Sequence, residues 1–336
     1  MQNLLDPAIL FFVFGVLAGA LKSNLEISPA IAKFLSLYLL MALGLKGGFA
    51  LSHSGLSSAV LLSLGAAMLM AFIVPALGYQ FLKNRVSRFD AAAVAASYGS
   101  VSAVTFVTAM QYLEGLQLSP GGHMAVALVV MESPAIIMAV LLANTLRHAQ
   151  AGALILSPTG GAAVAAFGGV KAGPPLGKIL HESFTDGAHL LLLGAMAVGY
   201  LSGDAGKAVM APFSSDLFKG MLAFFLLDMG LMVAKNFGSV RDKSAALIAY
   251  ACIGPLVHAA IALAMAVLLQ LPVADAALLM VLSASASYIV VPAVLRYAIP
   301  EANPSLYFGL SLGVTFPLNI LFGIPLYTHV ARQVLG

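Results

Sequence analysis

Long apolar runs, separated by short polar loops, make up most of this chain of 336 residues. A helix needs about 20 mostly apolar residues to cross roughly 30 Å of hydrocarbon, and the pattern predicts ten such spans. Their approximate bounds are 7–21, 30–50, 57–82, 90–113, 121–146, 186–202, 213–234, 243–270, 274–299 and 305–332. We therefore expect an all-α, polytopic membrane protein.

The fourth and ninth predicted spans are interrupted near their middle by small hydroxyl residues. The fourth contains Tyr98-Gly-Ser-Val-Ser102 and the ninth contains Ser283-Ala-Ser-Ala-Ser-Tyr288. Lipid cannot hydrogen-bond a freed backbone group, so a broken helix at this depth must be buried or must line a cavity. Matched interruptions in two halves of a chain indicate a transporter's binding site. The alternative is that these small residues only let helices pack closely.

The two halves of the chain resemble each other. The aligned pairs are Asp6 with Asp186, Gly19 with Gly199, Lys33 with Lys219, Gly44 with Gly230, Asp90 with Asp275, Ser100-Val-Ser102 with Ser285-Ala-Ser287, and Pro134 with Pro317. Five spans per copy is an odd number, so the second copy must lie inverted in the membrane. We predict a first five-helix repeat over 1–146, a cytoplasmic linker over 147–185 and an inverted repeat over 186–336.

The composition supports this assignment and excludes other classes. Hydrophobic residues make up 61% of the chain and charged residues 9%, whereas soluble domains are about 25% charged. The net charge of +3 is spread over short loops, which argues against nucleic acid binding. Cys252 is the single cysteine, so neither an intrachain disulfide nor a Cys/His metal site is expected. We expect no cofactor, and a retained first helix rather than a signal peptide.

Loop charge predicts the orientation. If the loop after the first span is cytoplasmic, twelve Lys and Arg residues fall on that side and four on the other. Cytoplasmic loops carry the excess of Lys and Arg. Both termini are then outside, and the membrane is a bacterial plasma (inner) membrane. The four outer residues are Lys46, Lys207, Lys219 and Arg332.

Inversion of the second copy brings the two interruptions together near the midplane. Each half-helix that follows presents its N-terminus there, and its free N–H groups and positive dipole end favour an anion. Serine hydroxyls can cap these ends and also donate to a small oxyanion. The predicted substrate-binding residues are Gly99, Ser100, Val101, Ser102, Thr105, Ala284, Ser285, Ala286 and Ser287.

Two acids lie inside predicted spans, Glu132 in the fifth and Asp228 in the seventh. An intramembrane carboxylate is costly and is a functional candidate by default. The predicted sodium ligands are Glu132, Ser283, Tyr288, Thr315, Asn319 and Asp228. The alternative is that both acids are protonated and hydrogen-bonded between helices. We expect simple N-capping for Asp90 and Asp275, and interhelical hydrogen bonding for His189 and His258.

Several motifs resemble those of the SbtA-type sodium-dependent bicarbonate transporter family. Leu295-Arg-Tyr-Ala-Ile-Pro-Glu-Ala-Asn-Pro-Ser305 follows the family's LRxxIPxANPS run, and Tyr98-Gly-Ser-Val-Ser102 resembles its first substrate segment. Met131-Glu-Ser-Pro134 resembles its acid-x-Pro element, with Glu for Asp. The resemblance covers almost the whole chain. It implies two inverted repeats split into core and gate domains, a homotrimer, and sodium-coupled bicarbonate uptake by an elevator-like alternating access.

The resemblance has one departure that bears on function. The family's second segment is a serine run followed by Asp and then Gly-Pro-Pro, whereas this chain has Tyr288 and then Val291-Pro-Ala. Cyanobacterial members are also inhibited by a PII-like protein on the cytoplasmic face, which is a candidate partner here. A proton- or sodium-coupled exchanger, or a carrier of another small organic anion, is the alternative function.

An enzyme is the third hypothesis, namely a serine hydrolase that uses Ser102 with His189 or His258. Ser102 lies in Ser100-Val-Ser-Ala-Val104 and not in the expected Gly-x-Ser-x-Gly motif. We therefore predict a transporter and not an enzyme. A passive channel is disfavoured because paired interruptions fit alternating access better than a continuous pore.

Overall fold

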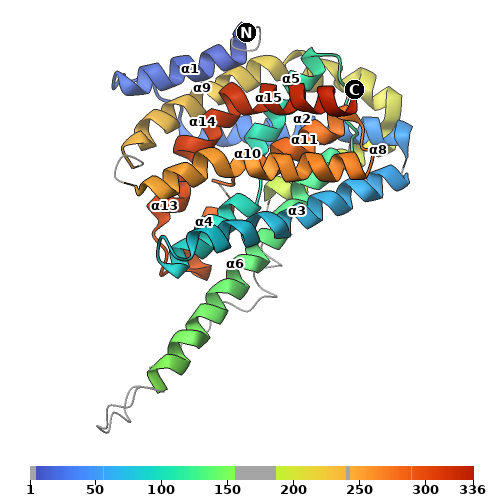
Figure 1. Ribbon diagram of the computed structural model, residues 1–336. Helices are drawn as coiled ribbons and strands as arrows, with labels where there is room; N and C mark the ends of the chain where they lie inside the picture. Colours follow the sequence, from blue (N-terminus) through green and yellow to red (C-terminus); the bar gives the residue numbers. More distant parts are fainter. Residues whose placement is uncertain (1–4, 56, 156–186, 240–242, 289) are drawn as a thin grey trace.

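The computed structural model describes residues 5–55, 57–155, 187–239, 243–288 and 290–336. In these ranges every regular element is helical (Figure 1). The α-helices are α1 Pro7–Ala20, α2 Pro29–Ser54, α3 Ser58–Leu82, α4 Arg88–Gly99, α5 Ala103–Gly115, α6 Met124–Ile155, α8 Gly187–Ala211, α9 Phe218–Asn236, α10 Ala245–Leu268, α11 Val273–Ala284, α12 Val290–Ala298, α13 Pro304–Leu310, α14 Phe316–Leu318 and α15 Ile324–Leu335. The π-helical segments are η2 Pro212–Asp216, η4 Ser311–Thr315 and η5 Asn319–Gly323, and η3 Phe237–Ser239 is a 3-10 turn.

Seven helical stretches of the described residues are long and apolar enough to cross a membrane. One of them, Gly187–Asn236, contains both α8 and α9, and another, Arg88–Gly115, contains both α4 and α5. Pro7–Ala20 and Val273–Ala284 are shorter apolar helices. The chain is thus a multi-pass membrane protein, as its composition predicts.

Side-chain caps place most of the helix starts. Ser28, Ser57, Ser87 and Ser244 each accept a hydrogen bond from a backbone N–H three residues later, and Asp6 accepts one from Ala8, two residues later. A cap satisfies one of the N–H groups that a helix leaves without an internal partner, which stabilises the helix by about 1 kcal/mol. The short polar loops between apolar runs are therefore also the helix start signals.

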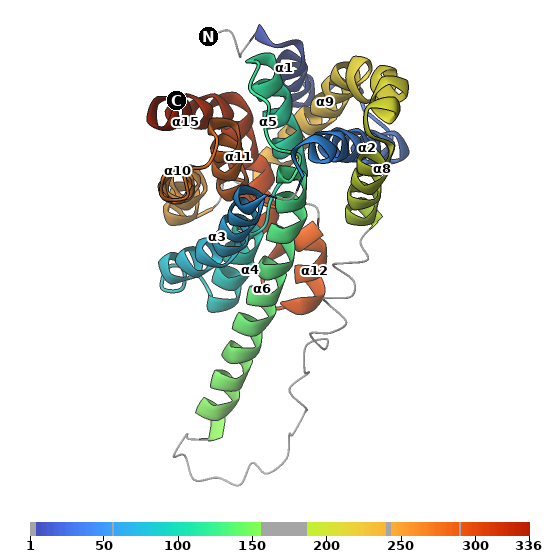
Figure 2. The same ribbon diagram turned by 90° about the vertical axis from the view of Figure 1, so that its right-hand side faces the viewer.

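Four helices, α1, α2, α8 and α9, form one group, which lies to one side of the other helices in Figure 2. Within this four-helix group, α1 packs on α9 and α2 packs on α8. The backbones meet at glycines, since a Cβ added at Gly230 would clash with the Phe12 carbonyl and one at Gly48 would clash with that of Met196. Small residues allow this close approach, which gains van der Waals contact between membrane helices.

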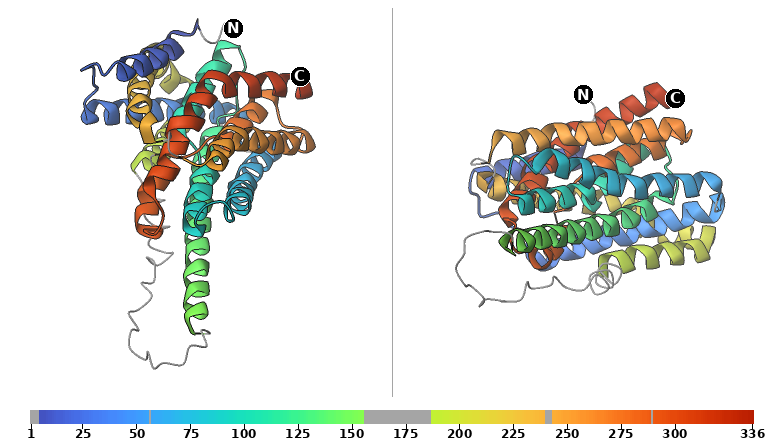
Figure 3. Two further views of the ribbon diagram at one scale, coloured as in Figure 1. Left: turned by 60° about the vertical axis from the view of Figure 1, so that its left-hand side comes forward. Right: turned by 60° about the horizontal axis from the view of Figure 1, so that its bottom comes forward.

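The remaining helices form the main group, in which α3 packs on α4 and α10 packs on α11. The helices α3, α10 and α15 run roughly parallel to one another in Figure 1. The described part of α6 continues to Ile155 and projects beyond the other helices (Figures 1 and 3). The sequence places the end of this span at 146 and a linker from 147, so α6 ends nine residues later than predicted. Residues 156–185 of the predicted linker lie outside the described residues.

Asp90 and Asp275 each hold a distant loop, which corrects the prediction of simple N-capping. The Asp90 carboxylate accepts the N–H of Asn303 at 2.8 Å, and Ser87 is the N-cap of α4. The Asp275 carboxylate accepts the N–H of Gly121 at 2.7 Å. Each acid at the start of a broken helix therefore binds the loop that follows the broken helix of the other half of the chain.

Polar contacts also hold the run Leu295–Ser305 in place. Arg147 binds Glu301 through two hydrogen bonds of 2.8 Å, which lowers the pKa of the Glu301 carboxyl, and it also donates to the Ala298 carbonyl. Asn303 caps α13 by accepting the N–H of Ser305 at 3.0 Å. This part of the chain shapes a loop and a helix start at one end of the main group.

Candidate functional site

The interruption in the fourth predicted span is a break between α4 and α5. The helix α4 ends at Gly99, and Ser100 is extended, with φ −94° and ψ −179°. The Ser102 side chain caps α5 by accepting the N–H of Thr105 at 3.2 Å, and the Thr105 hydroxyl lies 3.0 Å from the same oxygen. The short hydroxyl residues therefore end one helix and begin the next, as predicted.

The interruption in the ninth predicted span is a second break, between α11 and α12. The helix α11 ends at Ala284, and Ser285 is extended, with φ −86° and ψ 169°. The Ser287 hydroxyl accepts the N–H of Val291 at 3.3 Å near the start of α12. Ser287 therefore has the same position at this break as Ser102 has at the first.

The two breaks are in direct contact. The N–H of Ser287 donates to the Ser97 carbonyl at 2.8 Å, and the Ser97 hydroxyl donates to the Ser287 carbonyl. The N–H of Ser102 donates to the Ser285 hydroxyl at 3.0 Å, which itself donates to the Leu282 carbonyl at 2.8 Å. These bonds satisfy several of the backbone groups that the broken helices leave free, which lowers the cost of burial in an apolar medium.

Gly99 lets a neighbouring helix support the first break. A Cβ added there would lie 2.7 Å from two ring atoms of Pro75, which is inside α3. A side chain at position 99 would push α3 and α4 apart. Gly99 thus packs against a proline ring of the protein itself, and its role in substrate binding stays a prediction.

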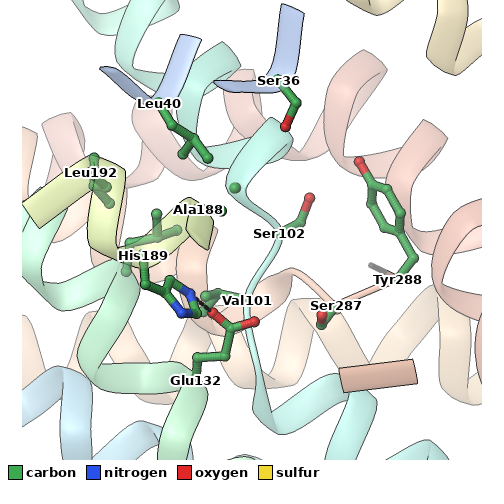
Figure 4. A pocket seen from close by; sticks show the side chains of 12 residues that line it. Ser36, Leu40, Val101, Ser102, Glu132, Ala188, His189, Leu192, Ser287 and Tyr288 are labelled. Atoms are coloured by element: carbon green, nitrogen blue, oxygen red, sulfur yellow. Dashed lines mark ion pairs between the residues drawn. The ribbon is translucent and has the colours of Figure 1, made fainter. Parts of the chain in front are cut away.

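A cavity of about 70 Å³ lies beside the contact between the breaks (Figure 4). One water molecule needs about 10–15 Å³ on this measure, so the cavity has room for a small ion. It lies between the two helix groups, and its walls are Ser36 and Leu40 of α2, Val101, Ser102 and Ala103 at the first break, Leu128 and Glu132 of α6, Ala188, His189 and Leu192 of α8, and Ser287 and Tyr288 at the second break.

The start of α5 provides free hydrogen-bond donors at this cavity. Among the described residues the N–H groups of Ala103 and Val104 have no acceptor, and Ala103 is part of the cavity wall. These are first-turn groups that a helix leaves without an internal partner, and they carry the positive end of the helix dipole. An anion in the cavity would satisfy them.

Glu132 and His189 form an ion pair on the opposite wall, and in Figure 4 the two side chains point toward each other. Both are nearly buried, with 5% and 8% of their surface exposed. The pair joins α6 of the main group to α8 of the four-helix group. His189 is thus an interhelical partner, as predicted, and it also lies in the cavity wall, which the sequence alone does not indicate.

The structure distributes the other predicted sodium ligands among different partners. The Thr315 hydroxyl bonds the Ala251 carbonyl at 2.8 Å and the Tyr98 hydroxyl at 2.6 Å. The Asn319 amide donates to the Ala284 carbonyl at 2.8 Å and accepts from Tyr327 at 3.1 Å. Neither residue is in the wall that contains Glu132. The three side chains therefore do not form one ligand set in this structure.

Three further predicted residues have distinct surroundings. Asp228 is buried in α9 and has no hydrogen bond or ion pair with any described residue. The hydroxyl of Tyr288 lies 3.7 Å from the Met229 sulfur of α9, and its ring packs edge-on against Phe316. The hydroxyl of Ser283 is buried without a partner among the described residues.

Some of the predicted substrate-binding residues line the cavity, and others lie behind its wall and support it. Val101, Ser102 and Ser287 line the cavity, whereas Gly99, Thr105 and Ser285 support it from behind. The buried hydroxyl of Ser100 has no partner among the described residues. Ser36 also lies in the cavity wall. The sequence does not predict this position, because a single serine in an apolar run is common in membrane helices.

Comparison with known protein families gives a match over nearly the whole chain. Residues 7–332 match the family model described as the Na+-dependent bicarbonate transporter superfamily. No curated protein sequence matches the chain.

Proposed function

The chain belongs to the Na+-dependent bicarbonate transporter superfamily, and from this membership we propose that it is a sodium-coupled symporter for bicarbonate or a similar small monovalent anion. The family is one of transporters rather than enzymes. The observation that carries the proposal is the cavity at the meeting point of two broken helices, with the unpaired N–H groups of Ala103 and Val104 beside it.

The wall chemistry supports a small monovalent anion. The cavity contains serine hydroxyls and a helix N-terminus but no Lys or Arg side chain. Dipoles and hydroxyl groups favour an anion less strongly than a full positive charge does, which suits a singly charged ligand that must also leave. Bicarbonate has four heavy atoms and both donor and acceptor oxygens, so it matches this size and polarity.

Glu132 supports coupling to a cation. Its carboxylate lies in the same cavity as the α5 N-terminus, and an anion there would be repelled by it. A sodium ion at Glu132 would neutralise the acid and attract the anion, so each ligand would favour the binding of the other. We propose Glu132 as the sodium ligand, with the other predicted ligands contributing in another conformation.

Glycine contacts support two inverted five-helix repeats. The sequence alignment relates Gly19 to Gly199 and Gly44 to Gly230, and by the same offsets Gly15 to Ala195. A Cβ at Gly230 would lie 3.0 Å from the Cα of Gly15, and one at Gly44 would lie 2.8 Å from the Cβ of Ala195. The contact of α1 with α9 therefore has its counterpart in the contact of α2 with α8.

The position of the cavity supports an elevator-like alternating access. One wall comes from the four-helix group and the other from the main group, which contains both breaks. We propose that the main group moves relative to the four-helix group and carries the anion and sodium with it. We further propose that the protein lies in a bacterial plasma membrane with both termini outside, as the loop charges predict.

The decisive experiment is uptake of labelled bicarbonate by purified protein in liposomes. We expect uptake when an inward sodium gradient is imposed, and none when potassium replaces sodium. Uptake that is equally fast in both salts contradicts sodium coupling. Competition by nitrate, formate and acetate in the same assay would identify the size of anion accepted.

Proton coupling is the second candidate, and the ion pair between Glu132 and His189 favours it. A histidine next to an acid in the cavity is a candidate carrier of the coupled proton. In this case an inward proton gradient drives uptake without sodium, and replacing His189 by Gln abolishes that uptake. The same liposomes distinguish the two coupling ions.

A further inference from the structure

A second, larger cavity lies on the same boundary between the two helix groups. Its volume is about 360 Å³, and its walls come from α2, α5, the loop before α6, α8 and η2. The wall residues are Lys46, Gly47, Phe49, Ala50, His53, Met110, Glu114, Ser119, Pro120, Gly122, Lys207, Ser214 and Ser215. The positive-inside pattern places Lys46 and Lys207 on the outer side.

The two cavities follow the same helices. On α2 the smaller cavity contacts Ser36 and Leu40, and the larger one contacts Lys46 and Ala50. On α5 the smaller cavity is at the first residue, Ala103, and the larger one is at Glu114 near the end. They are therefore successive spaces along one interface, separated by about two turns of α2, or roughly 10 Å.

Tight packing of α2 against the start of α6 separates the cavities. A Cβ added at Gly122 would clash with the Gly47 carbonyl, and a Cβ added at Gly47 would lie 3.4 Å from the Cβ of Ala125. A side chain at Gly122 does not fit against the backbone of α2. We call this contact the partition, because along the chain Gly122 lines the larger cavity and Leu128 of α6 lines the smaller one.

The larger cavity carries excess positive charge. Lys46 forms an ion pair with Glu114 at 2.9 Å and also lies over the Phe218 ring, 4.4 Å from its centroid. Lys207 has no ion pair with any described residue, and its side chain is exposed. His53 is bound to Asp204 at 2.8 Å. The wall itself thus has two ammonium groups and one carboxylate, that of Glu114, while Asp204 binds His53 from outside the wall. The exposed residues Ser119 and Ser215 are also in the wall.

We propose that this cavity is an outer vestibule that captures the anion before transport, with Lys207 as the attracting charge. The proposal rests on the transport function proposed above. A cavity lined by one sign of charge raises the local concentration of the opposite ion and its association rate. An anion that reaches Lys46 also competes with Glu114 for the ammonium group.

This competition links capture to opening of the partition. The bond between Lys46 and Glu114 joins α2 to α5, so it crosses the boundary between the two helix groups beside Gly47. Both side chains are partly exposed, at 18% and 35%, and a solvent-exposed ion pair is weak enough for a dissolved anion to replace. Once the anion has replaced Glu114, the bond no longer holds α2 against α5.

Cysteine labelling tests the vestibule without relying on transport. Ser119→Cys is introduced into Cys252→Ser protein in intact cells, and its modification by anionic MTSES is compared with that by cationic MTSET. We expect Lys207→Glu to lower the MTSES-to-MTSET rate ratio on the order of tenfold, the low end of electrostatic steering. Lys219→Glu, a charge reversal at a lysine outside the cavity wall, is expected to leave it unchanged.

Two labelling results would overturn the proposal. One is equal rate ratios in the Lys207→Glu and Lys219→Glu proteins. The other is a Ser119→Cys thiol that neither reagent reaches from outside. Absence of sodium-driven bicarbonate uptake in the parent protein would reject the proposed function, and the labelling ratio would then still decide whether the cavity attracts anions.

Uptake kinetics in liposomes test the link to transport. We expect Lys207→Glu to raise the apparent KM for bicarbonate several-fold with little change in the maximal rate, and raised ionic strength to reduce the difference, because salt screens exposed charges. Lys219→Glu keeps the parent KM. A Lys207→Glu protein with the parent KM at low ionic strength contradicts the role of the vestibule in capture.

Discussion

The hydroxyl group of Ser102 has two tasks in this molecule. It caps α5 through the N–H of Thr105, and it lies in the wall of the smaller cavity. The sequence predicts both tasks, since Ser-x-Ser inside an apolar run can end one helix and start another. It does not predict that Ser285 turns away from the cavity to bond the Ser102 N–H, because that depends on how two distant breaks meet.

Replacing Ser102 by Ala is expected to raise the apparent KM for bicarbonate roughly tenfold, because a hydrogen bond to a charged group is worth about 1.5–3 kcal/mol. The measurement is sodium-driven uptake over a bicarbonate series. Thr108→Val is the control, since the Thr108 hydroxyl bonds the Val104 carbonyl within the same helix. Equal KM values for the two variants would place the substrate elsewhere.

Replacing Glu132 by Gln removes the charge that we assign to sodium binding. We expect the sodium concentration for half-maximal uptake to rise at least tenfold, because the neutral amide no longer attracts the cation. Uptake at fixed bicarbonate over a sodium series measures this. Glu301→Gln, at an acid that binds Arg147 and lies outside the cavity wall, serves as control. A variant with the parent's sodium dependence would remove Glu132 from the ligand set.

At the scale of elements, the apolar pattern located the broken helices but not all helix ends. The breaks at Ser100–Ser102 and Ser285–Tyr288 follow the predicted positions. The π-helical turns η4 and η5 flank Pro317, which lacks an N–H and so widens the helix locally. Asp90 and Asp275 look like caps in the sequence because their loop partners are about 150 or more residues away.

Contacts between elements also explain the run Leu295–Ser305, which carries the most specific family motif. Glu301 binds Arg147, and Asn303 caps α13 while its N–H binds Asp90. These contacts shape a loop rather than a substrate site. A motif can therefore identify a family through residues that position its helices.

Gly230→Ala tests the packing of α9 on α1. The added Cβ would clash with the Phe12 carbonyl, and overpacking costs about 1–3 kcal/mol. We expect a lower midpoint of thermal unfolding in detergent and less folded protein in the membrane. Gly220→Ala in the same helix is the matched control, because a Cβ at Gly220 meets nothing within 4 Å. Equal midpoints would show that α1 and α9 are not tightly packed in solution.

At the scale of the whole molecule, two groups of helices meet along a boundary that contains both cavities. The sequence predicted the apolar runs and the two interruptions, but it could not predict this boundary. Its walls are built from α2, α5, α6 and α8, and contacts between distant helices depend on side-chain shape rather than on apolar periodicity. His189 is the clearest example, since its partner Glu132 lies on another helix.

A disulfide across the partition tests relative movement of the two groups. The Cβ position at Gly47 lies 3.4 Å from the Cβ of Ala125, close to the separation of about 3.8 Å in disulfides. In Cys252→Ser protein, we expect Gly47→Cys with Ala125→Cys to lose uptake on oxidation and to regain it with a reductant. Each single cysteine variant should transport in both conditions. Full uptake by the crosslinked protein would mean that the groups do not separate here.

The contact between Gly99 and the ring of Pro75 has a mechanical consequence. A proline inside α3 rests directly on the backbone where α4 ends, so this end cannot move toward α3 without displacing that helix. The backbone at the end of α4 is therefore stiff. The free energy gained on ion binding then displaces the helices as a rigid body and does not deform the broken segment locally.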